Sequence, residues 1–313
     1  MSARTRVVAG LSIIGASAAV EPVWHLARSA GDGCWPPNCE DAQVPLATPV
    51  VAHAGRLLMI GDGAAPSRSF ESTDGKQWRG FDHDARWGAT YGAAHASFAG
   101  KLWRAGGFVQ DGATRVTRND VWSSVDGRHW ERVLPSAPWI ARANAHLIAF
   151  RDTLWLIGGE PSDGSIWLTT DGRSWSARRT TSLPLANPQG VLAYRGALWI
   201  LGHGQWDTAS NDVWTSSDGG AWTRLTRSAA WEPRTGAGFA VLGDRLWVVG
   251  GAGHRDAWFS SDGRDWRPLA APWPGPPRAA DYSVVFQDAF WVYGGKTGGL
   301  GGTGFWDGVV YLK

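Results

Sequence analysis

The sequence predicts an all-β fold, a six-bladed β-propeller of four-stranded antiparallel blades. Three observations predict it. A Trp-centred strand ending in Gly recurs, and steps of 45, 52, 44, 48 and 44 residues separate its six copies. An Asp-Gly turn follows this strand in five of the six units. The chain also has 42 Gly and 22 Trp among 313 residues, which is typical of short strands joined by tight turns. A repeat of this length has the size of one propeller blade.

The recurring strand is the second of each unit and is called strand b. It reads Asp-Thr-Leu-Trp-Leu-Ile-Gly-Gly in one unit, and its first copy has Leu in place of Trp. The central residues are Leu58, Trp103, Trp155, Trp199, Trp247 and Trp291. In a radial stack each blade buries both faces against its neighbours, so large flat side chains fill the widening wedge between blades. Most of the Trp is therefore predicted to be core.

A β-hairpin follows strand b in the first five units. Its Asp-Gly turn is a strong hairpin signal, because Gly adopts positive φ freely and the Asp carboxylate accepts hydrogen bonds from backbone amides. The turns are Asp74-Gly75, Asp126-Gly127, Asp171-Gly172, Asp218-Gly219 and Asp262-Gly263. An apolar run precedes each strand b, as in Ala145 to Phe150. Each unit thus reads as strands a, b, c and d.

The ends of the chain complete this scheme. The sixth unit has strand c near Gly308 to Leu312 but no strand d after it. The segment Val23 to Arg28 resembles the other d strands and precedes the first strand a. We therefore expect it to complete the last blade and close the ring, which removes exposed sheet edges. The expected blades span about 45–86, 87–138, 139–182, 183–230, 231–274, and 275–313 together with 20–30.

The repeated pattern resembles the kelch-repeat family, also called galactose-oxidase-like propellers. The resemblance rests on the apolar strand, the Trp strand ending in Gly-Gly, and the Asp-Val-Trp start of the c–d hairpin, over about residues 20 to 313. The hairpin Ser-x-Asp-Gly-x-x-Trp, as in Ser124 to Trp130, also looks like a shortened Asp-box of the sialidases. That box is a structural turn, so the resemblance implies a fold and no particular activity.

The N-terminus carries an export signal. Arg4 and Arg6 precede the apolar run from Val7 to Ile14, and small residues follow, so residues 1–19 are predicted to be a signal peptide. The alternative is an N-terminal arm that is retained. The only cysteines, Cys34 and Cys39, would form a local disulfide in an exported chain; a metal site there would need more ligands. A secreted or periplasmic location is expected.

Charge and composition exclude several partners. The net charge is +2 with acids and bases interspersed, so no nucleic-acid surface is expected. The apolar N-terminal run is too short to span a bilayer. His95, His146 and His203 fall in different registers of the repeat, which argues against a three-His metal site. We expect a monomer without cofactor or metal.

Functional residues are expected on one face of the ring, formed by the d–a connections and the b–c loops, where the units differ most. Three arginines each stand 13 residues before a b-strand Trp and could hold an anion bidentately; alternatively they tie adjacent blades together. Trp side chains could stack on a sugar, or could fill a repeat position in the core. The candidate ligand-binding residues are Arg142, Arg234, Arg278, Asn144, Asp281, Trp139, Trp231 and Trp206.

The resemblance does not extend to the enzymes of the fold. Galactose oxidase needs copper and a Tyr–Cys cross-link, whereas both cysteines here lie in an N-terminal loop. Sialidases pair an Arg triad with Tyr and Glu, and Tyr91 and Tyr282 lack an obvious Glu partner. No catalytic residue is assigned. The sequence favours a non-catalytic binding module for a glycan or protein partner, and the alternative is an enzyme on acidic sugars, similar to a sialic-acid mutarotase or epimerase.

Overall fold

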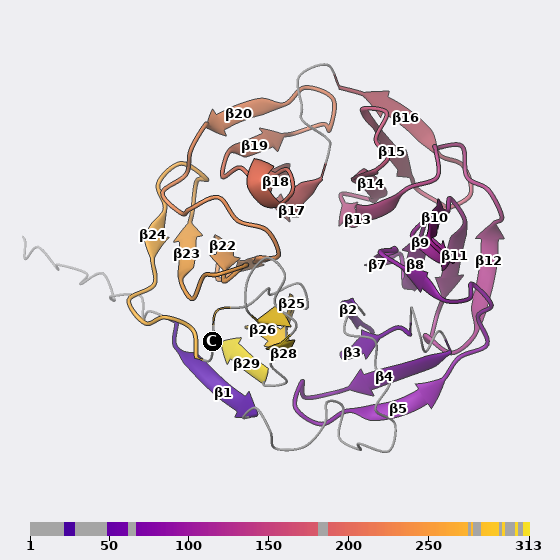
Figure 1. Cartoon of the computed structure of the whole chain (residues 1–313), viewed down its shortest axis with the longest axis horizontal. Coiled ribbons are helices and arrows are strands. Elements are labelled where there is room, and N and C mark those ends of the chain that lie inside the picture. Colours follow the sequence, from indigo (N-terminus) through magenta and orange to yellow (C-terminus); the bar gives the residue numbers. More distant parts are fainter. Residues whose placement is uncertain are drawn as a thin grey trace, which may run out of the picture.

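The computed structural model describes residues 22–28, 49–61, 67–180, 187–274, 277, 283–293, 296–297, 304–305 and 309–313. They form six four-stranded antiparallel sheets arranged as blades around a common axis (Figure 1). The fold is a kelch-like β-propeller, as the sequence predicts. Among the described residues, no helix is long and apolar enough to cross a membrane.

In each blade, strand a lies next to the axis and strand d lies on the perimeter. Blade 1 contains β2 (Val50–His53), β3 (Arg56–Met59), β4 (Arg68–Ser72) and β5 (Arg79–Asp82); blade 2 contains β7 (Ala94–Phe98), β8 (Lys101–Ala105), β11 (Val121–Ser124) and β12 (Trp130–Leu134); blade 3 contains β13 (Ala143–Phe150), β14 (Thr153–Glu160), β15 (Ser165–Thr169) and β16 (Ser176–Arg179).

The second half of the ring repeats this order. Blade 4 contains β17 (Pro188–Tyr194), β18 (Ala197–His203), β19 (Val213–Ser216) and β20 (Thr223–Thr226); blade 5 contains β21 (Gly238–Leu242), β22 (Arg245–Val249), β23 (Ala257–Ser260) and β24 (Arg267–Pro268); blade 6 contains β25 (Ser283–Phe286), β26 (Ala289–Tyr293), β29 (Val309–Leu312) and β1 (Trp24–Arg28).

The N-terminal strand closes the ring, which confirms the expectation from the sequence. β1 pairs antiparallel with β29, with Trp24 opposite Leu312, although 284 residues separate the two strands' first residues. Backbone bonds of 2.9 and 3.2 Å between Val23 and Lys313 extend the pairing by one residue. Trp24 then packs edge-on against Trp273 from the connection between blades 5 and 6.

Among the described residues, this aromatic pair is one of four equivalent pairs. At each of these junctions, the Trp that begins strand d meets a Trp from the preceding d–a connection, with ring centroids 4.6–6.2 Å apart and ring planes 72–83° apart. Edge-to-face packing suits the quadrupoles of aromatic rings. The pairs are Trp87–Trp130, Trp139–Trp175, Trp231–Trp266 and Trp273–Trp24. The same contact thus anchors the incoming connection to strand d in blades 2, 3, 5 and 6.

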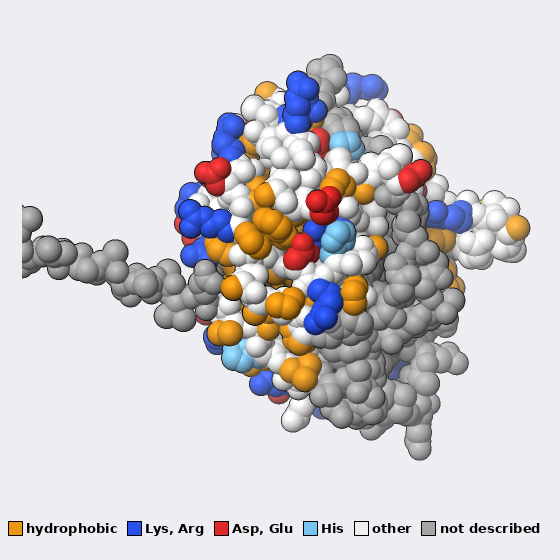
Figure 2. Space-filling model, turned by 60° about the vertical axis from the view of Figure 1, so that its left-hand side comes forward, with side chains coloured by type: hydrophobic (Ala, Val, Ile, Leu, Met, Phe, Trp, Pro, Cys, Tyr) orange, Lys and Arg blue, Asp and Glu red, His pale blue; other side chains and the backbone are white. Residues whose placement is uncertain are grey.

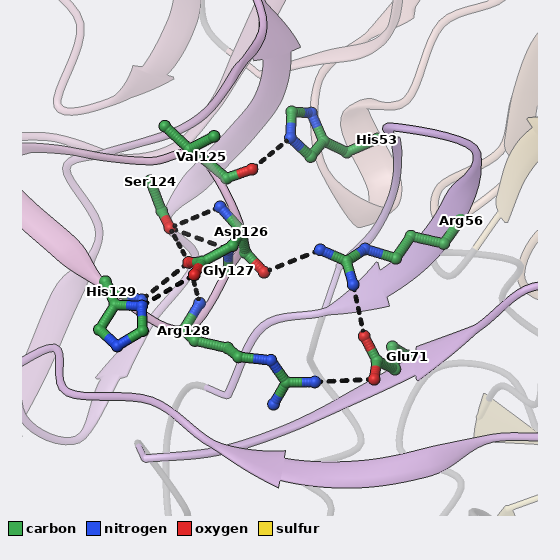
Figure 3. A network of polar contacts seen from close by, with 9 residues as sticks. All are labelled: His53, Arg56, Glu71, Ser124, Val125, Asp126, Gly127, Arg128 and His129. Atoms are coloured by element: carbon green, nitrogen blue, oxygen red, sulfur yellow. Dashed lines mark hydrogen bonds and ion pairs between the residues drawn. The ribbon is translucent and has the colours of Figure 1, made fainter.

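The face with the a–b and c–d turns is joined by side chains that reach from one blade to the next. Between blades 1 and 2, Glu71 accepts hydrogen bonds from Arg56 at 2.8 Å and from Arg128 at 2.7 Å (Figure 3). Arg56 also donates to the carbonyl oxygen of Asp126, and His53 donates to that of Val125 at 3.0 Å. The Asp-Gly turn of blade 2 is therefore held by blade 1.

One segment departs from the sequence interpretation. Residues 108–118 lie between strands b and c of blade 2, where the four-strand repeat places only a loop, but they form the hairpin β9 (Phe108–Asp111) and β10 (Thr114–Thr117). Its two-residue turn is Gly112-Ala113, with Gly112 at φ +55°, and the Asp111-Gly112 pair gives it the same sequence signal as the c–d turns. β6 (Thr90–Tyr91) adds a third strand, in the order β10-β9-β6. A second small hairpin, β27 (Lys296–Thr297) and β28 (Gly304–Phe305), follows β26.

Two histidines that are largely shielded from water, His83 and His146, make the stability of the ring depend on pH. Burial lowers the pKa of His83 to about 4, and it also lowers the pKa of His146, against the opposing effect of its hydrogen bond to the Pro188 carbonyl. In the unfolded chain such groups take up a proton near pH 6.5, whereas the folded chain stays neutral until the lower pKa. The stability that these histidines contribute is therefore fully present above about pH 6.5. It is lost as the pH falls below that value, toward about 4 for His83.

We expect His146→Gln, which keeps a side-chain donor but cannot be protonated, to lose less stability than the parent between pH 7 and about 5. His129→Gln is the control of opposite sign, because a hydrogen bond to Asp126 raises the pKa of the exposed His129. Protonated His129 favours the folded state at low pH, so its removal should make the loss steeper. Melting temperatures across the pH range test both variants; parallel pH profiles for His146→Gln and the parent would contradict the assignment.

Candidate functional site

Two of the three candidate arginines, Arg142 and Arg234, lie among the described residues, and both stabilise their own blade. Arg142 is 1% exposed and donates to the carbonyl oxygen of Gly158 at 3.1 Å and to Asp163 at 3.0 Å. Arg234 is 2% exposed and donates to the carbonyl oxygen of Gly250 at 2.9 Å and to Asp256 with both terminal nitrogens. Each joins the ends of strands b and c of one blade. Their described side-chain contacts lie within one blade, although the Arg142 backbone bonds to Arg118 and Gly107 of blade 2.

The same contacts lower the pKa of the two carboxylates that these arginines bind, Asp163 and Asp256. Burial alone would raise the pKa of Asp256, but hydrogen bonds from Arg234 and Trp258 outweigh this and the net pKa is lowered. The pKa of Asp163 is lowered in the same way, by Ser165 and Arg142 against the effect of burial. A ligand anion would have to displace these carboxylates from buried guanidinium groups, which is costly. Arg142 and Arg234 are therefore not available to bind a ligand.

The remaining candidates divide between the core, the surface and the parts of the chain that are not described. Trp139 and Trp231 are buried members of the aromatic pairs, so neither ring offers a face to a sugar. Asn144 is exposed at the start of β13, in a left-handed conformation with φ +56°. Trp206 begins the short helix η2 (Trp206–Thr208), but its side chain lies outside what is described. Arg278, Asp281, Cys34 and Cys39 also lie outside the described residues.

The structure does gather other polar groups on the predicted face, at the ends of four strands in blades 3 and 4. Contacts between the blades join part of the set, because Gln205 donates to Glu160 and His146 donates to the Pro188 carbonyl at 2.8 Å. Asn144 follows Ala143, the register partner of Glu160, and its side-chain oxygen lies beside Gly92 of blade 2. Gln189 donates to the carbonyl oxygen of Gly204 at 2.6 Å. We call this set the loop-face cluster, and it consists of Asn144, Glu160, Gln189, His203 and Gln205.

His203 is the most strongly oriented member of the cluster. Its Nδ1 lies 2.8 Å from an oxygen of Asp212 and 2.7 Å from Ser210 Oγ. The side chain of Asp212 is 5% exposed and that of His203 is 25% exposed. Burial would raise the pKa of Asp212, but hydrogen bonds from His203, Ser210 and Trp214 lower it overall. Asp212 is thus an anion that holds the ring with Nε2 free of any partner among the described residues.

This arrangement is not a serine nucleophile site. Ser210 and Asp212 both contact Nδ1, whereas in a Ser-His-Asp triad the serine and the acid contact opposite ring nitrogens. No group of three or more His, Cys, Asp or Glu side chains in the described ranges is placed to hold a metal ion. The chemistry available at the cluster is hydrogen bonding by amides, one carboxylate and one oriented imidazole.

Sequence reasoning missed the pairing of His203 with Asp212, although a signal for it was present. In blades 3 and 5 an arginine 13 residues before the b-strand Trp satisfies the acid that precedes strand c. In blade 4 that position is Ala186, so Asp212 needs another donor. His203 and Ser210 supply it from the b–c loop.

The described residues on one flank of the ring form no large region of one charge. The view toward the flank with β24 and β1 shows acidic, basic and hydrophobic side chains interspersed (Figure 2). This agrees with the net charge of +2 and the even distribution in the sequence. Specific contacts at a small site are therefore favoured over long-range electrostatic attraction of a highly charged partner.

Comparisons with known proteins bear on the fold. No protein-family model matches the chain, and no curated protein matches it. A solved structure, described as the structure of YjhT, a kelch-repeat propeller protein, is similar with a TM-score of 0.71 at 15% sequence identity. The match covers 87% of this chain and 98% of that chain. At this identity the similarity extends to the fold alone.

Proposed function

We propose that this chain is an exported kelch-type binding module that takes a neutral glycan at the loop-face cluster. The observation that carries the proposal is the set of hydrogen-bonding groups that the cluster leaves open. Asn144 is exposed, and neither its side-chain amide nor His203 Nε2 has a partner among the described residues. An amide both donates and accepts, as does a sugar hydroxyl, so these groups suit a polyhydroxyl ligand.

Charge favours a neutral glycan over an acidic one. The cluster contains the Glu160 carboxylate, which would repel an anionic ligand, and its described members include no Lys or Arg. The two described arginines of the predicted anion site are buried against Asp163 and Asp256. Export rests on the signal-peptide pattern of residues 1–19, which places the module where polysaccharides occur.

A glycan array, followed by calorimetry with the best ligand, tests the proposal. Asn144→Gly removes the amide while retaining the left-handed backbone, and combined with Gln205→Ala it should weaken binding about tenfold or more, because two or more hydrogen bonds are lost. Gln77→Ala, an exposed amide in the c–d turn of blade 1, is the matched control and should bind normally. Absence of glycan binding, or equal loss in the control, would reject the site.

A second candidate is the enzyme on acidic sugars, and the oriented His203 is the observation that favours it. With Nδ1 held by Asp212, Nε2 is available to accept a proton from the anomeric hydroxyl of a sugar. The bond between the anomeric carbon and the ring oxygen then breaks to give the open-chain carbonyl, and the proton passes to the ring oxygen; ring closure on the other carbonyl face reverses these steps. Faster interconversion of sialic-acid anomers, followed by NMR and abolished in His203→Gln, would favour catalysis. Glycan binding without such turnover would favour the binding module.

A further inference from the structure

The hairpin β9–β10 has an open edge on the same side of the ring as the loop-face cluster. β10 is the outer strand of the sheet β10-β9-β6, and β9 is the only described strand paired with it. Thr114, Arg115 and Val116 are exposed, Val116 to 44%. The strand Thr-Arg-Val-Thr has high β propensity and contains neither Pro nor Lys, residues that commonly block such edges.

The register shows which backbone groups the edge offers. A two-residue turn makes Asp111 and Thr114 a hydrogen-bonded pair, and such pairs alternate along an antiparallel ladder. Val116 therefore bonds inward, as does Arg118, whose N–H donates to the Gly107 carbonyl at 2.8 Å. Arg115 and Thr117 then direct their N–H and C=O groups outward. These four groups have the spacing that an added strand requires.

Side chains hold this edge in place. On one face of the three strands, Tyr91 stacks on Phe108 with centroids 5.5 Å apart, and the Arg115 guanidinium lies 3.8 Å from the Phe108 ring centroid. The row runs from β6 across β9 to Arg115 of β10, whose guanidinium reaches back from the edge strand over the Phe108 ring. Stacking and cation–π contacts of this kind reduce the freedom of a short hairpin. The edge is therefore ordered before any partner arrives.

We propose that β10 binds an extended segment of a partner protein as an added β-strand, with an acidic side chain beside Arg115. The outward groups of Arg115 and Thr117 supply the backbone bonds, which is the usual source of affinity in β-strand addition. The exposed Arg115 supplies selectivity, because its guanidinium favours a carboxylate on the neighbouring strand. This site is separate from the glycan cluster and does not depend on glycan binding.

The test uses the peptide acetyl-Thr-Val-Glu-Val-Thr-amide at about 1 mM, in the range of weak recognition. Amide NMR of the full chain should show shift changes and slowed hydrogen exchange at Arg115 and Thr117. Thr117→Pro removes only an outward N–H, so the hairpin should remain and binding should fall about tenfold or more. Arg132→Gln, an exposed arginine on β12 of the same blade, is the matched control and should leave binding unchanged.

Arg115→Gln keeps the backbone edge intact and tests the charge. The peptide with Lys in place of Glu should bind the parent several-fold more weakly, and Arg115→Gln should remove this preference. Three results would each overturn the proposal: amide shift changes spread over the whole protein, no shift change at Arg115 and Thr117, or full peptide binding by Thr117→Pro. Loss of glycan binding in Asn144→Gly with peptide binding retained, or the reverse, separates failure of one site from failure of the other.

Discussion

Gly172→Ala is expected to destabilise the propeller by about 3 kcal/mol, from overpacking together with backbone strain. Gly172 has φ +72° and lies in the Asp-Gly turn of blade 3. A methyl group there would enter the ring of Trp103 in strand b of blade 2, closer than carbon atoms can approach, and that ring is buried with no room to move. Urea unfolding monitored by circular dichroism measures the change.

Gly127→Ala is the matched control, because its turn has the same sequence role and φ +76°. The preceding blade has Leu58 where other blades have Trp, so the new methyl group would lie 3.4 Å or more from its nearest neighbours, on Leu102 and Leu58. Only the backbone strain of about 1 kcal/mol remains. Trp103→Leu should rescue much of the Gly172→Ala loss. Equal effects of the two Gly substitutions, or no rescue, would show that strain rather than the aromatic contact decides.

Trp24→Ala is expected to destabilise the chain by about 3 kcal/mol, since it removes the aromatic pair that closes the ring. Trp24 packs against Trp273 at 6.2 Å between centroids and lies opposite Leu312 in the β1–β29 pairing. Opening of the closing strand should also raise amide exchange in β29 before the rest of blade 6. Thermal unfolding and hydrogen exchange together test both effects.

Leu26→Ala tests whether position in β1 matters, because Leu26 lies in the same strand but is 53% exposed. Its effect should stay within about 0.5 kcal/mol. If both variants melt like the parent, β1 does not hold the ring closed, and the N-terminal strand would be dispensable. If both are equally damaging, the loss reflects the strand itself rather than the Trp24–Trp273 contact.

The sequence by itself determined the number of blades, the strand order and the closing strand. Trp at intervals near 44–52 residues and Asp-Gly in five of the six units are local signals. β1 could be recognised because it has the pattern of a d strand without a blade of its own. The sequence also contained the signal for the hairpin β9–β10, since Asp111-Gly112 lies between alternating residues. The four-strand repeat assigns only a loop between strands b and c, yet blade 6 has a similar small hairpin, β27–β28, at the same place.

The tertiary structure alone decided where the functional side chains point. Arg142 and Asn144 are two residues apart, yet one is buried against Asp163 and the other is exposed at the edge of blade 3. Spacing along the chain specifies the strand on which a residue lies but not its partner in the b–c loop, because those loops differ in length between blades. The pairing of His203 with Asp212 arises for the same reason: a buried acid without its arginine accepts whichever donor the loop brings within hydrogen-bonding distance.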